Sequence, residues 1–294
     1  MRRILHLSML CFAAGVVGAC SRDEVIATEN IPTAGVRFIN AVPDTAGGFG
    51  LDFRFVDLVE SNAQFRVTYR NNPVVTSGVP ASTQIEYKNA RAGARRFRVF
   101  LDDTLQSVAS VVLKDSTMNI EAGKLYTVIL MGNARSTAAA DRMRLVVIDE
   151  SVADPGAQVA MRVVNTTSSA IDASQYAQGA SAPAAATWAN VAPYSVSTYV
   201  TAAPGAYMFN VKSAGAALFA DAQALPGAAA RSSAGAGGKI DIEALPGTTV
   251  AGSAISAIVF PRSTAGAKTP QTATFLVPAI SFMWDRRPPR PAGI

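Results

Sequence analysis

Short segments that alternate apolar and polar residues recur along the chain from about residue 36, and they predict β-strands. Four examples are residues 36–39, 51–55, 97–101 and 126–130. They are enriched in β-branched and aromatic residues, and their apolar positions recur with a period of two, as expected for strands with one buried face. Glycine, proline, asparagine and aspartate separate these segments, and no helical periodicity is sustained beyond the N-terminal region. The pattern therefore predicts an all-β fold.

The segment around Phe97 shows how such a strand is expected to lie. Phe97, Val99 and Leu101 alternate with Arg96 and Arg98. Because successive side chains of a strand point to opposite faces, the three apolar residues should face the core and the two arginines should face solvent.

The strand pattern also repeats along the chain. The paired segments are 37–40 and 162–165, 93–99 and 205–211, and 120–123 and 243–247. Their offsets are 125, 112 and 124 residues, so the order of strands is kept while the loops change in length. A repeat of this length predicts two tandem domains rather than a solenoid.

We expect these domains to be antiparallel β-sandwiches of immunoglobulin-like type, covering residues 35–150 and 157–280. The polar segment 149–156, which contains proline and glycine, would link them. Residues 281–294 are predicted to form a basic, proline-rich tail.

The N-terminal segment has the anatomy of an export signal. Arg2 and Arg3 precede a mostly apolar stretch over residues 4–17, which is short for a membrane span. The stretch ends in residues 17–20, Val-Gly-Ala-Cys, which resemble the lipobox of bacterial lipoproteins. That resemblance implies a signal peptide over residues 1–19, cleavage between Ala19 and Cys20, and acylation of the Cys20 thiol. An uncleaved anchor, or an ordinary cleavage in which Cys20 is incidental, is the alternative.

Cleavage would remove much of the chemistry that the chain could perform. Residues 20–34 would form a lipidated tether, and the only histidine, His6, and the second cysteine, Cys11, lie in the removed segment. The mature chain would then have no histidine and no free thiol, which excludes Ser-His-Asp and Cys-His catalysis and zinc sites of the His/Cys type. Loss of Arg2 and Arg3 leaves 24 basic against 21 acidic residues, so the net charge falls from +5 to +3.

The opening of the first domain resembles domain-of-unknown-function family 4397. The resemblance lies in residues 36–44, VRFINAVPD, in Leu51-Asp52-Phe53 and in residues 122–128, AGKLYTV. It covers residues 35–150 well and 157–280 in degraded form, and it implies secreted or surface-attached β-domains. A histidine that is frequent in the family is replaced here by Asn40 and Asn165, so any role tied to that histidine does not carry over.

Candidate metal ligands do not form a recognisable motif. Asp44, Asp52 and Asp57 are spread over the first domain, and Asp102 and Asp103 form an isolated pair. Calcium loops place several carboxylates close together around a glycine, and no such run occurs. We therefore expect these residues to lie in turns and on strand faces, with no metal and no cofactor.

Basic residues cluster in two places. Arg91, Arg95, Arg96 and Arg98 are close in sequence, but a small net charge on an exported chain favours a solvated strand face over nucleic-acid binding. Anionic glycans or lipid headgroups are the alternative ligands. The arginines of the tail 281–294 could contact envelope phosphates or a partner groove. A frayed basic tail, with Trp284 packed on the last domain, is the favoured interpretation.

Taken together, the sequence predicts a membrane-anchored lipoprotein of the bacterial cell envelope. We expect a non-catalytic binding, adhesion or structural role, with an envelope protein or a glycan as partner. Ser21 follows Cys20 where an aspartate would imply inner-membrane retention, which favours the outer membrane. A hydrolase that acts on glycans through carboxylates alone is the alternative, and a subunit of an outer-membrane assembly is a third option.

Overall fold

The structure is a computed structural model, and it describes residues 31–44, 50–57, 66–67, 69–71, 87–219, 221–227, 247–263, 273 and 275–288. The predicted signal peptide, Ala19, Cys20 and all of the tether before residue 31 lie outside the described residues. All of the described strands belong to the compact unit Thr33–Ile294.

The regular secondary structure of the described residues consists almost entirely of strands. In chain order the strands are β1 (Thr33–Ala41), β2 (Leu51–Phe55), β3 (Arg66–Val67), β4 (Lys88–Arg91), β5 (Gly93–Leu101), β6 (Val112–Ile120), β7 (Leu125–Met131), β8 (Arg144–Asp149), β9 (Val159–Asn165), β10 (Ile171–Ala177), β11 (Trp188–Val191), β12 (Ser195–Val196), β13 (Val200–Ala202), β14 (Tyr207–Ser213), β15 (Ala216–Ala217), β16 (Gln223–Ala224), β17 (Ala254–Phe260) and β18 (Ala279–Arg286). Short helical turns are η2 (Tyr69–Asn71), α2 (Gln106–Ala109) and η3 (Ala139–Asp141).

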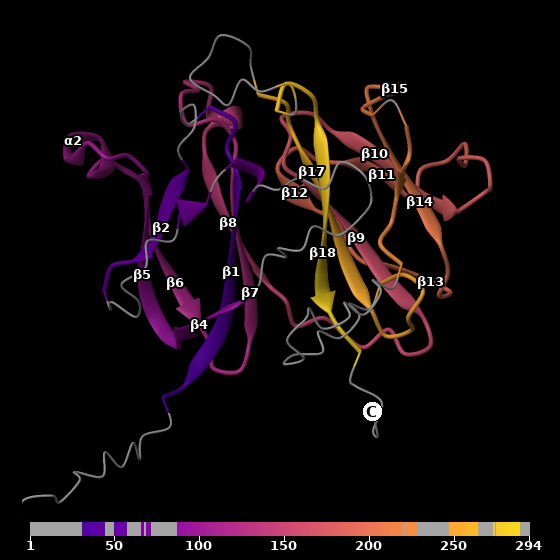
Figure 1. Cartoon of the computed structure of the whole chain (residues 1–294), viewed down its shortest axis with the longest axis horizontal. Coiled ribbons are helices and arrows are strands. Elements are labelled where there is room, and N and C mark those ends of the chain that lie inside the picture. Colours follow the sequence, from indigo (N-terminus) through magenta and orange to yellow (C-terminus); the bar gives the residue numbers. More distant parts are fainter. Residues whose placement is uncertain are drawn as a thin grey trace, which may run out of the picture. The chain divides into compact units, whose positions relative to one another are not determined.

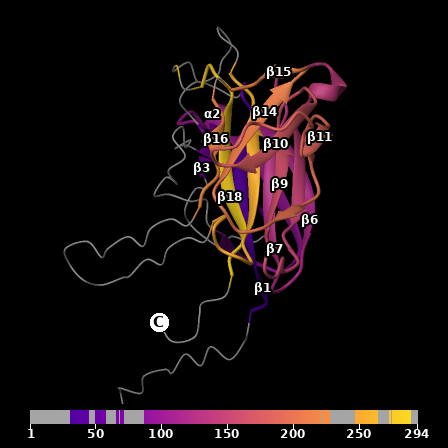
Figure 2. The ribbon, with the colours of Figure 1, turned by 90° about the vertical axis from the view of Figure 1, so that its right-hand side faces the viewer.

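These strands build four sheets that form two sandwiches. In the first sandwich, the sheet β4-β1-β7-β8 packs on the sheet β3-β2-β5-β6. In the second, the sheet β12-β9-β17-β18, to which β13 is added beside β9, packs on the sheet β11-β10-β14-β15, to which β16 is added beside β14. The four layers follow one another across Figure 1, and Figure 2 looks onto β10 and β14 of the outermost layer. The predicted all-β sandwich architecture is confirmed.

The two sandwiches share one strand order. In each, the first strand pairs in parallel with the strand before the last: β1 with β7, and β9 with β17. The last strand then pairs antiparallel with that neighbour, β8 with β7 and β18 with β17. The sequence predicted antiparallel sheets only. The parallel pairs could not be predicted from local sequence, because most strands of a sandwich lie between the two paired strands along the chain.

The core of the first sandwich is aromatic. Phe38 of β1 packs against Phe53 and Phe97, with ring centroids 5.4 Å away in both cases. Phe97 and Val99 are fully buried, whereas Arg96 is exposed and Arg98 is partly exposed. The predicted orientation of strand β5 is therefore confirmed.

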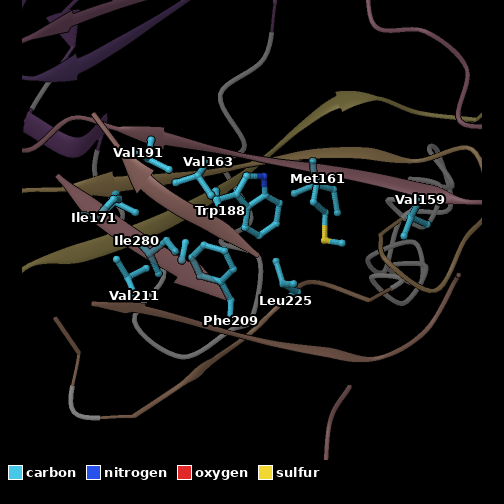
Figure 3. Packing of buried hydrophobic residues seen from close by; sticks show 14 of the residues in the cluster. Val159, Met161, Val163, Ile171, Trp188, Val191, Phe209, Val211, Leu225 and Ile280 are labelled. Atoms are coloured by element: carbon cyan, nitrogen blue, oxygen red, sulfur yellow. The ribbon is translucent and has the colours of Figure 1, made fainter. Parts of the chain in front are cut away.

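The core of the second sandwich is built around Trp188 and Phe209. Figure 3 shows the two rings among branched side chains from both sheets, including Val163, Ile171 and Ile280. Trp284 of β18 belongs to the same core. Both tryptophans of the chain are therefore core residues of the second sandwich.

A third apolar layer lies between the sandwiches. Ile39 and Ala41 of β1 and Ile129 and Met131 of β7 are fully buried in it. From the second sandwich it takes Val164, Tyr194, Ile258, Phe260 and Met283. The central strands β1, β7, β9 and β17 are thus covered on both faces, and the prediction of one buried face is wrong for them.

The chain ends differ from their predicted boundaries. Strand β1 begins at Thr33, inside the predicted tether. Strand β18 continues to Arg286, and Trp284 and Asp285 are buried, so residues 281–286 are sandwich rather than tail. Glu150, predicted to lie in a polar link, is buried as well. Glu150 and Asp285 are buried because they form ion pairs with arginines between the two sandwiches.

Candidate functional site

The most unusual grouping of ionisable side chains lies within the layer between the sandwiches. Its four charged members are Arg37, Glu150, Arg162 and Asp285, and their side chains are 0–7% exposed. We call these four residues, with Thr127, Ser256, Tyr87 and Tyr199, the charged joint. Burying charge is costly unless every charge is paired and hydrogen-bonded, so the partners of each member decide what the joint can do.

Arg37 projects from β1 toward the second sandwich, because its neighbours Val36 and Phe38 point into the core of the first. Its Nε donates to Thr127 Oγ1 (2.7 Å), which β7 places directly opposite in the parallel register. Nη1 donates to the carbonyl oxygen of Trp284 (2.9 Å).

The remaining nitrogen of Arg37 bridges the two acids. Nη2 donates to Asp285 Oδ1 at 2.6 Å and to Glu150 Oε1 at 3.3 Å. The Arg37 guanidinium also lies over the ring of Tyr87, 4.5 Å from its centroid. Arg37 therefore binds carboxylates of both sandwiches at once.

Arg162 of β9 occupies the matching position in the second sandwich. Its Nε donates to Ser256 Oγ (2.7 Å) on β17, the residue opposite it in register. Nη2 donates to Glu150 Oε2 (2.6 Å) and lies 3.6 Å from Asp285 Oδ2. Its guanidinium lies over the ring of Tyr199, 4.6 Å from the centroid.

The two carboxylates accept further hydrogen bonds from hydroxyl groups. Thr127 Oγ1 donates to Glu150 Oε1 (2.5 Å), while Ser256 Oγ (2.5 Å) and Tyr199 Oη (2.8 Å) donate to Asp285 Oδ2. Glu150 directly follows β8, and Asp285 lies where a shift of register interrupts the β17–β18 pairing. Each carboxylate is therefore positioned by the last strand of its own sandwich.

Burial governs the ionisation of the joint. The pKa of Glu150 is raised above its ordinary value, first by desolvation and then by the nearby charge of Asp285. Burial likewise raises the pKa of Tyr87 to about 12. The pKa of Tyr199 is raised too, mainly by burial and then by the charge of Asp285.

The charged joint is approximately symmetric: each of its residues in one sandwich has an equivalent residue in the other. The equivalent pairs are Arg37 and Arg162, Thr127 and Ser256, Glu150 and Asp285, and Tyr87 and Tyr199. The first pair is separated by the same 125 residues as the sequence repeat. Two copies of one sandwich topology therefore present the same face to each other, as in an isologous interface.

Two further contacts fix the rim of the joint. Arg70, buried in η2 of the first sandwich, donates through Nη2 to the carbonyl oxygens of Pro261 (2.6 Å), Val277 (2.6 Å) and Phe275 (3.4 Å). From the second sandwich, the hydroxyl of Tyr194 donates to Asp141 Oδ1 in η3 of the first sandwich, at 3.2 Å. Each sandwich thus holds the loop before the last strand of the other.

The candidate ligands from the sequence do not form one cluster, although Asp52 of β2 and Asp102, directly after β5, lie close enough to Arg54 for both to raise its pKa. Asp44 accepts the backbone N–H groups of Ala134 (2.7 Å) and Arg135 (2.8 Å), and so fixes a loop. Asp52 pairs with Arg54, and Asp57 pairs with Arg95. Asp103 accepts the N–H of Leu105 in a turn. Among the described residues, no group of three or more His, Cys, Asp or Glu side chains could hold a metal ion.

The clustered arginines act as strand-face residues. Arg96 and Arg98 both donate to Asp115, whose pKa their hydrogen bonds lower to about 2. Arg95 differs from the prediction, because it is buried against the ring of Phe55 and pairs with Asp57.

Asn40 and Asn165, the equivalent asparagines of the sequence repeat, have a structural role. The side-chain amide of Asn40 donates to the carbonyl of Val67, and that of Asn165 donates to the carbonyl of Val191. The amide oxygen of each asparagine accepts the N–H of the residue two positions later. Both asparagines therefore fix the turn at the end of the first strand of their sandwich.

One comparison with known proteins finds a family. Residues 34–174 match the model of the family described as Domain of unknown function (DUF4397). The match begins in β1, covers the first sandwich and continues through β9 into β10. A comparison with curated proteins finds no match. None of the helices in the described ranges has the length and hydropathy of a membrane span.

Proposed function

We propose that this chain, whose residues 34–174 match the DUF4397 family model, is a lipid-anchored envelope protein with a non-catalytic binding or structural role. In this proposal Cys20 is acylated, the leader is removed, and residues 20–32 connect the lipid to the sandwiches. Two or three acyl chains would hold the protein on a membrane essentially permanently, since each buried CH₂ contributes about 0.8 kcal/mol. Ser21 favours the outer membrane.

One observation carries the non-catalytic part of the proposal. The two carboxylates brought together in the joint, Glu150 and Asp285, are fully buried and accept hydrogen bonds from Arg37 and Arg162. A general acid or nucleophile must reach a substrate, and these groups face the interior of an interface. Their chemistry is suited to holding two sandwiches in one fixed arrangement, which favours a rigid recognition or spacer unit over a glycan hydrolase.

The anchoring is tested by membrane fractionation of cells that express the full chain. Cys20→Ala should move the protein from the membrane fraction to the soluble fraction and abolish labelling by a palmitate analogue. Cys11→Ala is the matched control, because it removes the other cysteine from a position that cleavage discards. Unchanged fractionation of Cys20→Ala would refute the proposed anchor.

The non-catalytic role is tested by glycosidase and esterase screens of residues 20–294. We expect no turnover above that of the substrate alone. Turnover that disappears in a single Asp→Asn or Glu→Gln variant, with the fold retained, would instead support the carboxylate hydrolase.

A further inference from the structure

Strand β6 forms a long edge of the outer sheet of the first sandwich. It has nine residues, and among the described strands β5 is its one neighbour. Figure 2 shows β6 along the right-hand margin of the ribbon. In the second sandwich the strands β15 and β16, which lie beside β14, have two residues each. Because short edge strands discourage pairing with another chain, β6 offers a binding edge that β15 and β16 do not.

The register shows which main-chain groups β6 presents at this edge. Val56 donates its N–H to the carbonyl of Arg96, so the main-chain groups of Arg96 point toward β2. Those of the next residue, Phe97, point toward β6, where Phe97 faces Ser116. Alternate residues of β6 therefore direct their N–H and C=O groups away from β5. These outward residues, whose side chains are exposed as well, are Asp115, Thr117 and Asn119.

Positive charge is in excess along the β6 edge. Lys114 lies opposite the fully buried Val99, so it is on the inner side of the sheet, where it is half-buried. Lys114 forms no ion pair within the part of the chain that the structure describes. On the outer side, Arg96 and Arg98 share the single carboxylate of Asp115. Three cations and one carboxylate thus line this edge.

Exposed apolar side chains lie where β6 begins. Leu105 and Val111, on either side of α2, are 63% and 44% exposed, and Val112 of β6 is 43% exposed. The structure shows seven large apolar side chains as exposed, and these three belong to one connection and the strand that follows it. Exposed apolar side chains that occur together typically mark an interaction site.

We propose that the β6 edge binds an extended acidic segment of another envelope protein, which joins the sheet as a further strand. The inference deepens the proposed binding role and rests on it for its biological setting. Hydrogen bonds to the outward main-chain groups of Asp115, Thr117 and Asn119 supply affinity. Carboxylates of the partner neutralise the excess positive charge around Lys114, and an apolar residue of the partner covers Val112.

The charge along the edge distinguishes this partner from a second copy of the chain. Pairing of β6 with β6 of another copy would bring the same excess of positive charge to both sides of the new strand pair. Like charges across an interface suppress the wrong partner, whereas opposite charges favour the right one. A charged residue on the inner side of an edge strand, such as Lys114, also disfavours a purely apolar strand.

The experiment measures binding of a synthetic peptide to residues 20–294 with Cys20→Ser, so that no acyl chain is present. The probe is an acetylated and amidated peptide of alternating valine and glutamate, as long as β6. We expect it to bind and to slow hydrogen exchange at the outward amides of β6, because those amides become hydrogen-bonded. A valine–lysine peptide should bind roughly tenfold more weakly, because its charge matches that of the edge. A valine–glutamate peptide with N-methylated amides should not bind.

Thr117→Pro tests the main-chain hydrogen bonds on the side of the protein. It removes an N–H group that points away from β5, and an edge strand accommodates proline at such a position. Binding should be lost in Thr117→Pro and retained in Thr117→Ala, the matched control, which keeps the N–H group. Circular dichroism and the urea midpoint check that the fold is retained, and the N-methylated peptide tests the same bonds without a change in the protein.

Lys114→Gln tests the charge. It should weaken binding about fivefold, the upper contribution of one exposed ion pair. Lys212→Gln is the matched control, because Lys212 is exposed on β14 of the other sandwich.

Several outcomes would overturn the proposal. They are no binding of the valine–glutamate peptide, equal binding of the valine–lysine peptide, and equal binding to Thr117→Pro and Thr117→Ala. A dimer in sedimentation that Thr117→Pro dissociates would show that a second copy occupies the edge, and would overturn it too. Because these measurements involve neither a lipid nor a substrate, such a failure leaves the anchor to the Cys20→Ala fractionation and the non-catalytic role to the enzyme screens.

Discussion

Arg37 and Arg162 occupy equivalent positions in the two sandwiches, and each donates a hydrogen bond of 2.6 Å to a carboxylate of the other sandwich. Arg37 of β1 reaches Asp285 of β18, and Arg162 of β9 reaches Glu150, which follows β8. These crossed pairs lie within an apolar layer that joins the central strands of both sandwiches. The two sandwiches should therefore unfold as one cooperative unit.

Removing one guanidinium from the joint should be strongly destabilising. In Arg162→Met, the apolar stem is retained while Glu150 loses its 2.6 Å partner within a buried interface. Breaking a buried ion pair from one side typically costs about 3–5 kcal/mol. Urea unfolding should show a loss of this size. In the control Arg98→Met, which affects a partly exposed pair with Asp115, the loss should stay below about 1 kcal/mol. Similar losses in both variants would contradict the assigned importance of the joint.

The stability of the protein should depend on pH through Glu150. Its raised pKa means that the native state binds a proton at a higher pH than the unfolded chain does. The contribution of Glu150 to the free energy of unfolding is therefore fully present below its ordinary pKa, near 4.5, and is lost as the pH rises through the raised value. In Glu150→Gln, the free energy of unfolding, measured by urea unfolding at a series of pH values, should depend less on pH between 4.5 and the raised pKa of Glu150.

Asp115 provides a control for this pH dependence, because its pKa is shifted in the opposite direction from that of Glu150. Its pKa is lowered to about 2 by hydrogen bonds from Arg96 and Arg98, so its contribution is present above pH 3.8 and is lost only as the pH falls further. Asp115→Asn should leave the slope above pH 4.5 unchanged. A slope in that window that persists in Glu150→Gln would show that another group causes it.

The Tyr199 hydroxyl should contribute measurably to the joint. It donates to Asp285 Oδ2 at 2.8 Å, and hydrogen bonds to charged groups contribute about 1.5–3 kcal/mol. Tyr199→Phe should lower the free energy of unfolding by this amount. Tyr207→Phe, which removes an exposed bond to the carbonyl of Ala203, should have a smaller effect. An equal effect of the two changes would count against a special role of Tyr199.

Arg70 should hold the loop before β18 against the first sandwich. Its backbone has a left-handed φ of 60°, which favours glycine, so Arg70→Gly relieves the backbone while it deletes the guanidinium. We expect faster hydrogen exchange of residues 275–277 and a loss of about 2 kcal/mol, because three carbonyl oxygens lose their donor. Arg262→Ala removes an exposed arginine next to the same loop and serves as control. If Arg70→Gly were neutral or stabilising, backbone strain would outweigh the guanidinium contacts.

The strands were the part of the fold that local sequence could predict. The alternation around Phe97 places the apolar residues inside and Arg96 and Arg98 outside, as the structure has them. The repeat of residues 37–40 in 162–165 corresponds to β1 and β9, which hold the same place in their sheets. The period of the apolar residues and the strand propensity of the side chains suffice to predict these features, because residues close together in the sequence determine them.

The charged joint could not be predicted from local sequence, for a physical reason. Its acids lie 113 residues or more from Arg37 along the chain, in segments that look like a polar link and a basic tail. Only the packing of two sheets brings Glu150 and Asp285 to the arginines. One signal was present: Arg37 and Arg162 are equivalent residues of the repeat, each inside an otherwise apolar strand, where a charge needs a buried partner. The nearly continuous apolar run of residues 126–131 also indicated a strand covered on both faces.

The most direct test of the joined sandwiches places a mutation in one and the probe in the other. Trp188 and Trp284, the only tryptophans, lie in the second sandwich, so tryptophan fluorescence follows its unfolding. Phe97→Ala opens a cavity in the core of the first sandwich and should cost about 3–5 kcal/mol. If the joint makes the sandwiches one cooperative unit, the fluorescence midpoint in urea should fall together with that of circular dichroism. A fluorescence transition that does not move, beside a biphasic circular-dichroism curve, would show that the sandwiches unfold independently.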